Sequence, residues 1–375
     1  MRLRSETTTG GNHVQLLHDG EQCFPAMLEA IASAQHEILL EMYWFGSDKI
    51  GRRFAEALSE KARAGVRVCV TYDAVGSFEA DPAMFEQLRS AGCGVHVFNP
   101  LQLFRRRFRF ARLNRRNHRK QLIVDGQTAM TGGLNLGDPW LPESEGGLGF
   151  RDDMIKIQGP AVMEMRAIFL RTYAGAHRDE ARAAHLGSAE PVGTCSVRVL
   201  ANQPRAQRRV IERAYLARIR SARTRILITN SYFIPDRRIR NALSSAARRG
   251  VSVRVLLPVE SDVPAVAYAT RRLYEWLLTH GIELYEWGQS ILHSKTAVID
   301  GEWCTVGTHN IDHRSWAYNL EINVVVEHSA VTRAIETKMQ SDFDSSVPVD
   351  LRAWRFRPIG TRILELFFYA FRRLL

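Results

Sequence analysis

The feature that most constrains how this chain folds is a ten-residue motif that occurs twice. Residues 117–126 read Asn-His-Arg-Lys-Gln-Leu-Ile-Val-Asp-Gly, and residues 292–301 read Leu-His-Ser-Lys-Thr-Ala-Val-Ile-Asp-Gly. Both have the form His-x-Lys-x-x-x-x-Asp-Gly, and a downstream glycine and asparagine repeat at the same separation of 175 residues. A structural histidine beside a lysine would account for one copy but not for two in register. The chain is therefore predicted to be an internal duplication.

Each motif is predicted to form a strand followed by a tight turn. A histidine and a lysine two positions apart on a strand point to the same face. The aliphatic residues that follow favour a strand, and Asp-Gly is a strong turn signal. Each aspartate lies at an odd spacing from its histidine, so within the motif it is predicted to fix the turn rather than to act as an acid. The motif residues predicted for the catalytic site are His118, Lys120, Asp125, His293, Lys295 and Asp300.

Composition narrows the class of protein and of partner. At 375 residues the chain accommodates two domains or one large one. Its net charge of +11 favours an anionic partner, which is a nucleic acid, a phospholipid surface or a phosphorylated substrate. The five cysteines are scattered without a C-x-x-C pair, which argues against a disulfide framework or a zinc site. Residues 1–12 lack the apolar core of a signal peptide and no run approaches the ~20 apolar residues of a membrane span, so the body is expected to be soluble.

Helical and strand patterns alternate through both halves. Helices are predicted at 20–34, 49–64, 82–91, 205–222, 237–249 and 263–280, and strands at 37–45, 66–71, 94–98, 224–233, 250–257 and 281–287. This order predicts an α/β fold with two mixed β-sheets flanked by helices. We predict an N-terminal half at 11–175, a C-terminal half at 195–345, a linker within 174–194 and a basic amphipathic tail at 350–375. Two independent α/β domains are the alternative, but a site shared at a pseudo-twofold interface is preferred, because each half carries only one His and one Lys.

Two segments fall outside the duplicated pattern. The first half holds 20 residues between Phe98 and His118, against 8 between Tyr285 and His293. This insertion mixes aromatic residues with arginines, which suits either single-stranded nucleic acid or an anionic lipid surface. The second segment, 362–375, reads Arg-Ile-Leu-Glu-Leu-Phe-Phe-Tyr-Ala-Phe-Arg-Arg-Leu-Leu. It is predicted to be a helix that lies either in a membrane interface or on the protein's own core. The insertion residues predicted to contact lipid headgroups are Arg105, Arg106, Arg107, Phe108 and Arg109.

Two histidines and two lysines brought together suit phosphodiester chemistry without a metal or other cofactor. One neutral imidazole attacks phosphorus, and the other donates a proton to the leaving oxygen. The lysines offset charge on the non-bridging oxygens, and the asparagines after each motif add hydrogen bonds. Each histidine also needs a group that fixes its tautomer. The supporting residues predicted here are Asn135, Asn310, Asp152, Glu321 and Glu41; Asp152 and Glu321 are also compatible with purely structural ion pairs.

The doubled motif with its following Gly-x-x-Asn resembles the phospholipase D superfamily. Beyond the superfamily, the chain resembles the bacterial cardiolipin synthases, especially the shorter type without N-terminal transmembrane helices, from about residue 11 to residue 328. The segments that carry this resemblance are Asp19-Gly20-Glu21, Ile38–Phe45, Tyr72–Ser77, Leu113–Lys120, Phe150-Arg151-Asp152 and Val306–Asp312. The two copies depart from each other at Gly133 and Thr308, so their phosphate contacts need not be equivalent.

The resemblance implies two similar α/β halves with one site between them. It implies that a phosphatidyl group passes from phosphatidylglycerol, through a phosphohistidine, to the hydroxyl of a second lipid, with release of glycerol. On that pattern His118 is the nucleophile and His293 the acid and base, although the near-symmetry leaves the reverse assignment open. The implied partner is an anionic phospholipid rather than nucleic acid, met peripherally at the cytoplasmic face of the cell membrane. A phosphodiesterase or nuclease of the same superfamily is the alternative function.

Overall fold

The structure is a computed structural model that describes residues 7–100, 114–174, 189–202, 209–327 and 330–374. The strands of the first half are β1 (Thr9–His18), β2 (Glu37–Met42), β3 (Arg67–Asp73), β4 (Gly94–Phe98), β5 (Gln121–Val124), β6 (Thr128–Gly132) and β7 (Asp153–Gln158). Those of the second half are β8 (Cys195–Asn202), β9 (Arg225–Asn230), β10 (Ser252–Pro258), β11 (Glu283–Trp287), β12 (Lys295–Ile299), β13 (Trp303–Gly307), β14 (Glu321–Glu327) and β15 (Val347–Pro348).

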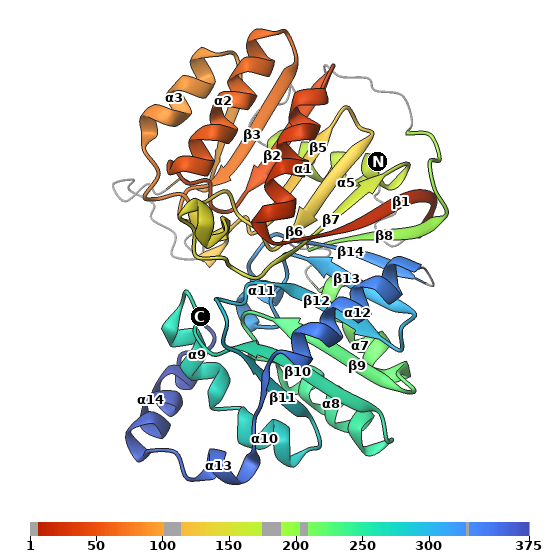
Figure 1. The fold of residues 1–375 in the computed structure, drawn as a ribbon, viewed down its shortest axis with the longest axis vertical. Helices are drawn as coiled ribbons and strands as arrows, with labels where there is room; N and C mark the ends of the chain where they lie inside the picture. Colours follow the sequence, from red (N-terminus) through yellow and green to blue (C-terminus); the bar gives the residue numbers. More distant parts are fainter. Residues whose placement is uncertain (1–6, 101–113, 175–188, 203–208, 328–329, 375) are drawn as a thin grey trace.

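All of these strands belong to one mixed sheet (Figure 1). Their order is β15-β11-β10-β9-β12-β13-β14-β8-β1-β7-β6-β5-β2-β3-β4. Apart from β15, the order reads as the same seven-strand pattern from either end, as a duplication related by a pseudo-twofold axis requires. The two mixed sheets expected from the sequence are present as the two halves of this sheet. They are joined edge to edge by the antiparallel pairing of β1 with β8.

Helices cover both faces of the sheet, as the alternating pattern predicted. The helices of the first half are α1 (Asp19–Ser33), α2 (Lys49–Arg63), α3 (Pro82–Ser90) and α5 (Ala161–Ala174). Those of the second half are α7 (Val210–Ser221), α8 (Arg237–Arg248), α9 (Pro264–Arg271), α10 (Tyr274–Thr279), α11 (His313–Ala317), α12 (Ala330–Asp344), α13 (Leu351–Arg355) and α14 (Ile359–Ala370). The single helix predicted at 263–280 is two helices, because the chain tightens at Leu273, whose N–H donates to the carbonyl of Thr270 three residues back.

Alternation along the buried strands divides the apolar residues between two layers. In β2, Ile38 and Leu40 pack under α1, α2 and α3, whereas Leu39 faces the opposite layer. That opposite layer is one core that includes residues of α5, α12 and strands of both halves. The halves therefore share a core as well as a sheet, which fixes the position of each motif relative to the other.

The local sequence explains why individual helices begin where they do. Asp236 precedes α8, and its carboxylate accepts hydrogen bonds from the backbone N–H groups of Arg238 and Ile239. Ile239 and Leu243 then recur at helical spacing and are fully buried. Burying such a side chain contributes about 1.5–3 kcal/mol. The cap fixes where α8 starts, and the apolar stripe attaches it to the sheet.

The tail predicted at 350–375 forms α13 and α14, and α14 packs against α9. Phe368 stacks on Tyr268 with 5.6 Å between ring centroids, and the fully buried Glu365 accepts two hydrogen bonds from Arg357. The opposite face of α14 is exposed. The helix thus docks on the protein through one face, which is one of the two alternatives that the sequence left open, and its other face stays exposed. None of the helices in the described part of the chain has the length and apolar character needed to cross a bilayer.

Candidate active site

His118 is positioned by the other half of the chain. It lies in an extended segment just before β5, not on the strand itself as predicted, and its backbone N–H donates to the carbonyl of Leu320. Its ring Nδ1 lies 3.0 Å from a carboxylate oxygen of Glu321, at the start of β14. The ring of Tyr43 packs edge-on against it at 5.0 Å. His118 is therefore a first-half residue that is oriented by a second-half carboxylate.

His293 has the reciprocal arrangement. It precedes β12, and its backbone N–H donates to the carbonyl of Arg151 at 2.8 Å. Its Nδ1 lies 2.8 Å from Asp152, and the ring of Trp140 packs edge-on against it at 5.2 Å. Asp152 is fully buried and also accepts a hydrogen bond from the indole N–H of Trp140. Each half thus lacks the carboxylate of its own histidine and supplies that of the other.

The two histidines line one pocket of about 520 Å³. Because Nδ1 of each ring faces a carboxylate, the tautomer with a proton on Nδ1 is favoured, and Nε2 is the nitrogen left for chemistry. Asn135 and Asn310 line the same pocket. The side-chain oxygen of Asn135 accepts from the backbone N–H of Trp44, and that of Asn310 from the Ser231 hydroxyl. Their amide N–H₂ groups are therefore the parts able to donate to a bound anion.

Burial sets the charge of these histidines. It lowers the pKa of His118 to about 4, aided by Lys120 and opposed by Glu321. It also lowers the pKa of His293, with Lys295 acting in the same direction and Asp152 against it. Burial raises the pKa of Glu321, but His118, His309 and Lys120 together outweigh it and hold that pKa at about 2. At neutral pH the unliganded site therefore holds ionised carboxylates beside neutral imidazoles, and a neutral imidazole is the nucleophilic form.

The two lysines lie beneath their histidines. Lys120 and Lys295 are buried, and each Nζ donates to the backbone carbonyl of the histidine two residues before it. Burial lowers the pKa of Lys120 to about 7, against the effect of Glu321, and Lys295 adds to the lowering. It also lowers the pKa of Lys295, against Asp152. The two ammonium groups are thus within electrostatic reach of each other, as an anion-binding pair needs to be.

Asp125 and Asp300, which were predicted for the catalytic site, are not among the residues that line the pocket. Each lies at the turn after the motif strand with a positive φ, 52° and 56°, and each is followed by a positive-φ glycine. The Asp125 carboxylate accepts hydrogen bonds from the backbone N–H groups of residues 35–37, at the start of β2. Asp300 does the same for residues 223–225 at the start of β9. Both aspartates fix turns, as their odd spacing indicated.

Glu41 supports the segment that carries His118 and is not among the residues that line the pocket. It is fully buried, and its carboxylate accepts hydrogen bonds from the side chains of Asn117 and Gln121, on either side of the first His-x-Lys. Asp73, which the sequence did not single out, accepts from the backbone N–H of Asn117 at 2.8 Å and lies 3.3 Å from Arg116. Together they hold the extended segment that carries His118. The sequence signal that could have identified both Glu41 and Asp73 is an acidic residue near the end of an apolar strand.

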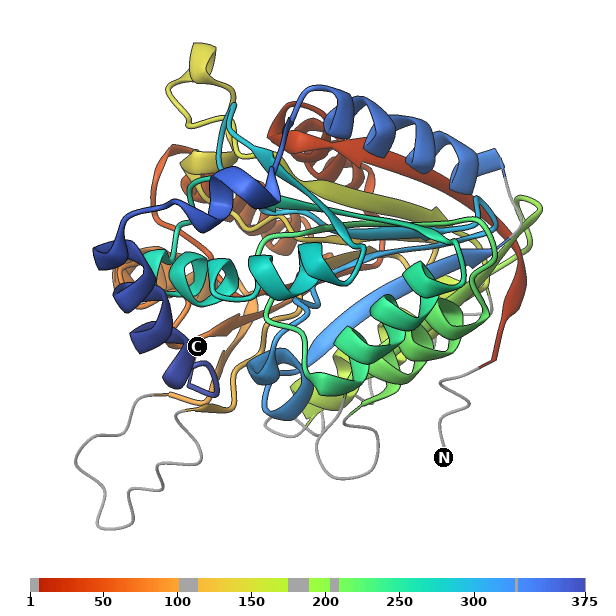
Figure 2. The ribbon, with the colours of Figure 1, turned by 90° about the horizontal axis from the view of Figure 1, so that it is seen from below.

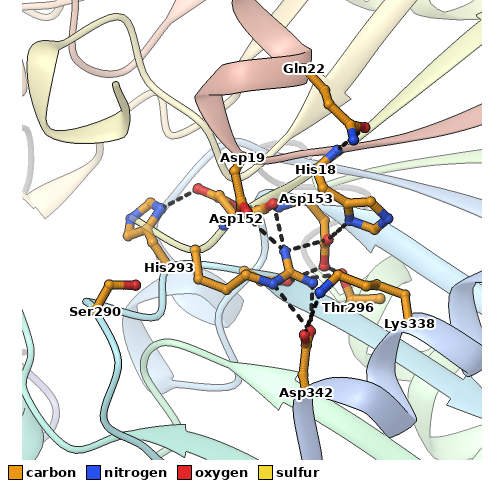
Figure 3. A network of polar contacts seen from close by, with 12 residues as sticks. His18, Asp19, Gln22, Asp152, Asp153, Ser290, His293, Thr296, Lys338 and Asp342 are labelled. Atoms are coloured by element: carbon orange, nitrogen blue, oxygen red, sulfur yellow. Dashed lines mark hydrogen bonds and ion pairs between the residues drawn. The ribbon is translucent and has the colours of Figure 1, made fainter. Parts of the chain in front are cut away.

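A second network lies around His293, and Figure 3 shows its members Asp152, Asp153 and Asp342. Arg151 pairs with Asp153 and with Asp342 of α12, and Asp153 also accepts hydrogen bonds from Thr296 and from Ser294, the residue after His293. These contacts join β7, β12 and α12. The charged run Arg151-Asp152-Asp153 indicated in the sequence that this segment is important. Its partners in α12 and beside His293 are more than 100 residues away, so they were not predictable from spacing.

The site is asymmetric where the two motifs differ. A side chain at Gly133 would place its Cβ 2.2 Å from Oδ1 of Asp152, so only glycine leaves room for that carboxylate. At the equivalent position Thr308 donates its hydroxyl to Glu321, and Asn319 donates to the same carboxylate at 3.2 Å. The shorter Asp152 thus lies over a glycine, and the longer Glu321 is held by a hydroxyl and an amide.

Gly133→Ala is expected to lower kcat by about 10²-fold or more, because its methyl group displaces Asp152 from His293 and releases the ring. Overpacking is also expected to lower the free energy of unfolding by about 1–3 kcal/mol. Steady-state kinetics and thermal unfolding measure the two effects. Thr308→Ser, which keeps the hydroxyl at the equivalent position, serves as the control. A wild-type kcat for Gly133→Ala would contradict the close packing described.

The remaining pocket wall is charged and aromatic, and sequence reasoning missed most of it. Arg116, Arg314, Asp262 and Asp312 line the pocket with Tyr232. Within the described ranges, no group of three or more His, Cys, Asp or Glu side chains is arranged to hold a metal ion. The insertion residues predicted to contact lipid headgroups, Arg105, Arg106, Arg107, Phe108 and Arg109, lie outside the described residues.

Comparisons with known proteins agree with this geometry. The family model described as "Cardiolipin synthase, PLD-like domain" matches residues 27–146 and 215–343, one stretch in each half. The cardiolipin synthase of Geobacillus thermodenitrificans (strain NG80-2) is 35% identical over 97% of this chain and 72% of that protein. Cardiolipin synthase 1 of Staphylococcus aureus (strain COL) is 33% identical over 95% of this chain and 72% of that protein.

A solved structure supports the fold. The phosphatidylserine synthase of Haemophilus influenzae Rd KW20 superposes with a TM-score of 0.74, covering 96% of this chain and 95% of that one at 15% identity. That identity supports a shared architecture and no more. The family match in both halves, and the relatives that match nearly all of this chain and 72% of their own length, fit the doubled motif and the site that the halves share. The chain therefore belongs to the cardiolipin synthase family of phospholipase D-like proteins.

Proposed function

We propose that this protein is a cardiolipin synthase-type phosphatidyltransferase, which moves a phosphatidyl group from phosphatidylglycerol to the hydroxyl of a second lipid and releases glycerol. The observation that carries the proposal is the reciprocal pairing of His118 with Glu321 and His293 with Asp152 around one pocket. The proposal treats residues 11–175 and 195–345 as the two halves of one catalytic unit and 350–375 as an added tail. It requires an intact chain, since neither half contains a complete histidine–carboxylate pair.

The reaction has two displacements at one phosphorus. Nε2 of neutral His118 attacks phosphorus and forms a P–N bond, while the P–O bond to glycerol breaks and cationic His293 gives its Nε2 proton to the departing oxygen. Neutral His293 then takes the proton of the acceptor hydroxyl, whose oxygen attacks phosphorus and breaks the P–N bond. The cycle returns neutral His118 and cationic His293. The charge of the bound phosphodiester favours the cationic form of His293, against the effect of burial.

The lysines and asparagines act on the oxygens that do not move. Ammonium groups of Lys120 and Lys295 offset the charge of the non-bridging oxygens, and the amides of Asn135 and Asn310 donate hydrogen bonds to them. When substrate binds, each lysine Nζ exchanges the backbone carbonyl to which it donates for an oxygen of the phosphate. These positions stay the same through both steps, so one set of donors serves both transition states.

The pH dependence follows from the two groups that must be protonated, Lys120 and His293, because burial lowers the pKa of both in the unliganded enzyme. Lys120 carries its proton below its pKa of about 7 in the unliganded enzyme. Loss of that proton removes a phosphate contact, and loss of the His293 proton removes the acid that protonates the departing oxygen, so kcat/KM on a monomeric substrate is expected to fall as pH rises to about 7 and beyond. On the acid side kcat/KM falls towards pH 4, where His118 becomes protonated. A profile between pH 4 and 9 measures both limbs, and a kcat/KM that rises steadily from pH 7 to 9 would contradict the role given to Lys120.

The direct test is to incubate purified protein with phosphatidylglycerol vesicles and to follow the lipid products and free glycerol by mass spectrometry. Cardiolipin formed with one equivalent of glycerol supports transfer. Phosphatidic acid as the main product would indicate hydrolysis, the phosphodiesterase alternative, since water then replaces the acceptor hydroxyl. A folded enzyme that formed neither cardiolipin nor phosphatidic acid would overturn the proposal. We further infer that the protein works peripherally on the cytoplasmic face of the cell membrane, where its net charge of +11 meets an anionic leaflet.

A further inference from the structure

The exposed apolar side chains of this protein gather on its tail. Of the fourteen large hydrophobic residues that are exposed in the described chain, eight lie between Phe356 and Leu374. Soluble proteins scatter such residues singly, and a contiguous group marks an interaction site. Figure 2 shows α14 as an outlying helix beside the C-terminus, with α9 between it and the body. The exposed group is therefore confined to one outer layer of the molecule.

Helical spacing separates the two faces of α14. Its docked face carries Glu365 and Phe368, whose contacts hold the helix on the protein. Its outer face carries Ile359 at 73%, Ile363 at 62% and Phe367 at 55% exposure, four residues apart along one stripe. Because the inner contacts are complete without these residues, the outer stripe is free to meet a partner without unfolding the tail.

A basic pocket lies at the end of this stripe. It has a volume of about 510 Å³ and is formed between the start of α8 and the end of α14, beside His313. The arginines that line it are Arg237, Arg238, Arg240, Arg372 and Arg373. They face a single lining carboxylate, Asp236, which is already engaged in capping α8. The buried Nε of Arg240 has no hydrogen-bond partner among the described residues. This excess of guanidinium groups suits a phosphate anion.

The basic pocket and the catalytic pocket share a wall. His313 lines the basic pocket, while its neighbours Asp312 and Arg314 line the catalytic one. In the same way Arg373 lines the basic pocket and Leu374 the catalytic one. The basic pocket thus lies next to the catalytic pocket, and Tyr369 and Arg372, which also line the basic pocket, connect it to the end of α14.

We propose that the outer face of α14 and the arginine-lined pocket form a docking surface for an anionic phospholipid bilayer, which brings the catalytic pocket to the lipid headgroups. Apolar side chains of the stripe enter the headgroup–acyl boundary, and the arginines contact lipid phosphates. An isolated apolar stripe would suit several partners, but a stripe that ends in unbalanced arginines is complementary to an anionic bilayer. The inference rests on the proposed function, because a bilayer is where that substrate is found.

The test compares two double variants with matched controls. Ile363→Glu/Phe367→Glu removes the apolar stripe, and Val192→Glu adds a charge at an exposed apolar residue whose backbone pairs with the start of β1. Arg237→Ala/Arg238→Ala removes two pocket charges, and Arg220→Ala/Arg333→Ala removes the same charge from α7 and α12. The full-length proteins are co-sedimented with vesicles of phosphatidylcholine alone and with vesicles that also contain phosphatidylglycerol. Thermal unfolding verifies that each variant folds as the wild type does.

Both docking variants are expected to lose about tenfold or more of their partition onto anionic vesicles, while both controls keep the wild-type partition. Turnover of vesicle substrate falls in parallel, but turnover of monomeric, short-chain phosphatidylglycerol stays within about twofold of wild type. Folded docking variants that bind anionic vesicles like the wild type would overturn the inference. So would equal binding of the wild type to neutral and anionic vesicles. If the wild type binds anionic vesicles through this surface but turns over neither substrate, the docking surface stands and the proposed activity fails.

Discussion

His118→Ala is expected to lower kcat by at least about 10⁴-fold, because no other group in the pocket replaces its Nε2 as nucleophile. The fold should persist, since the segment is held by backbone and neighbouring side chains rather than by the ring. Product formation from phosphatidylglycerol vesicles measures the loss. His13→Ala, at an exposed residue of β1, is the control and should retain wild-type turnover. More than about 1% residual activity in folded His118→Ala would contradict the role of nucleophile.

His293→Ala separates the two histidine roles. It is expected to lose turnover of phosphatidylglycerol to a similar extent, because glycerol departs poorly without a proton donor. A p-nitrophenyl ester of the same phosphatidyl group needs no such donor, so His293→Ala should release a burst of one equivalent of nitrophenol and then stall. His118→Ala should show no burst. The opposite pattern would exchange the assignments of the two histidines.

Glu321→Gln is expected to lower kcat by about 10³–10⁴-fold. An amide in place of this carboxylate allows the wrong tautomer of His118 and removes the charge that stabilises its cationic form. Because Glu321 lies on β14, the loss would show that a second-half residue controls a first-half nucleophile. Steady-state kinetics on monomeric substrate measures it without interference from vesicle binding.

The control for this prediction lies on the same strand. Glu327→Gln changes an ion pair with Arg218 at the other end of β14 and should leave kcat unchanged. Asp152→Asn should reproduce the Glu321→Gln loss from the other half, because Asp152 holds His293 in the same way. If Glu321→Gln kept a wild-type kcat, the reciprocal pairing would be a structural feature without a catalytic role.

The repeated spacing was enough to predict the duplication and the convergence of His118 and His293, and the alternation of helical and strand patterns predicted the α/β class. Glu321 and Asp152 were identified as partners because they occupy matching places after each motif. Their exchange between halves was not predictable, since spacing along the chain does not reveal which edges of two sheets meet. The pairing of β1 with β8 determines which edges meet, and this pairing is a tertiary contact between the two halves.

Other differences arose from local geometry and from side-chain packing. Both histidines lie just before their strands, because each segment forms its backbone bond with the opposite half before the regular ladder begins. The buried network of Arg151 depends on Asp342, far along the chain in α12. The amphipathic sequence of α14 predicted that one of its faces is apolar. It did not show which face packs on α9.

The central claim is that one phosphorus is attacked twice, first by a histidine of one half and then by an acceptor activated by the other. The stereochemistry at phosphorus tests it most directly. A phosphatidylglycerol made chiral at phosphorus with sulfur and an oxygen isotope would be converted to product, and the configuration of the product determined by ³¹P NMR. Two in-line displacements predict overall retention of configuration. Inversion would show a single direct transfer and would contradict the phosphohistidine on which this account depends.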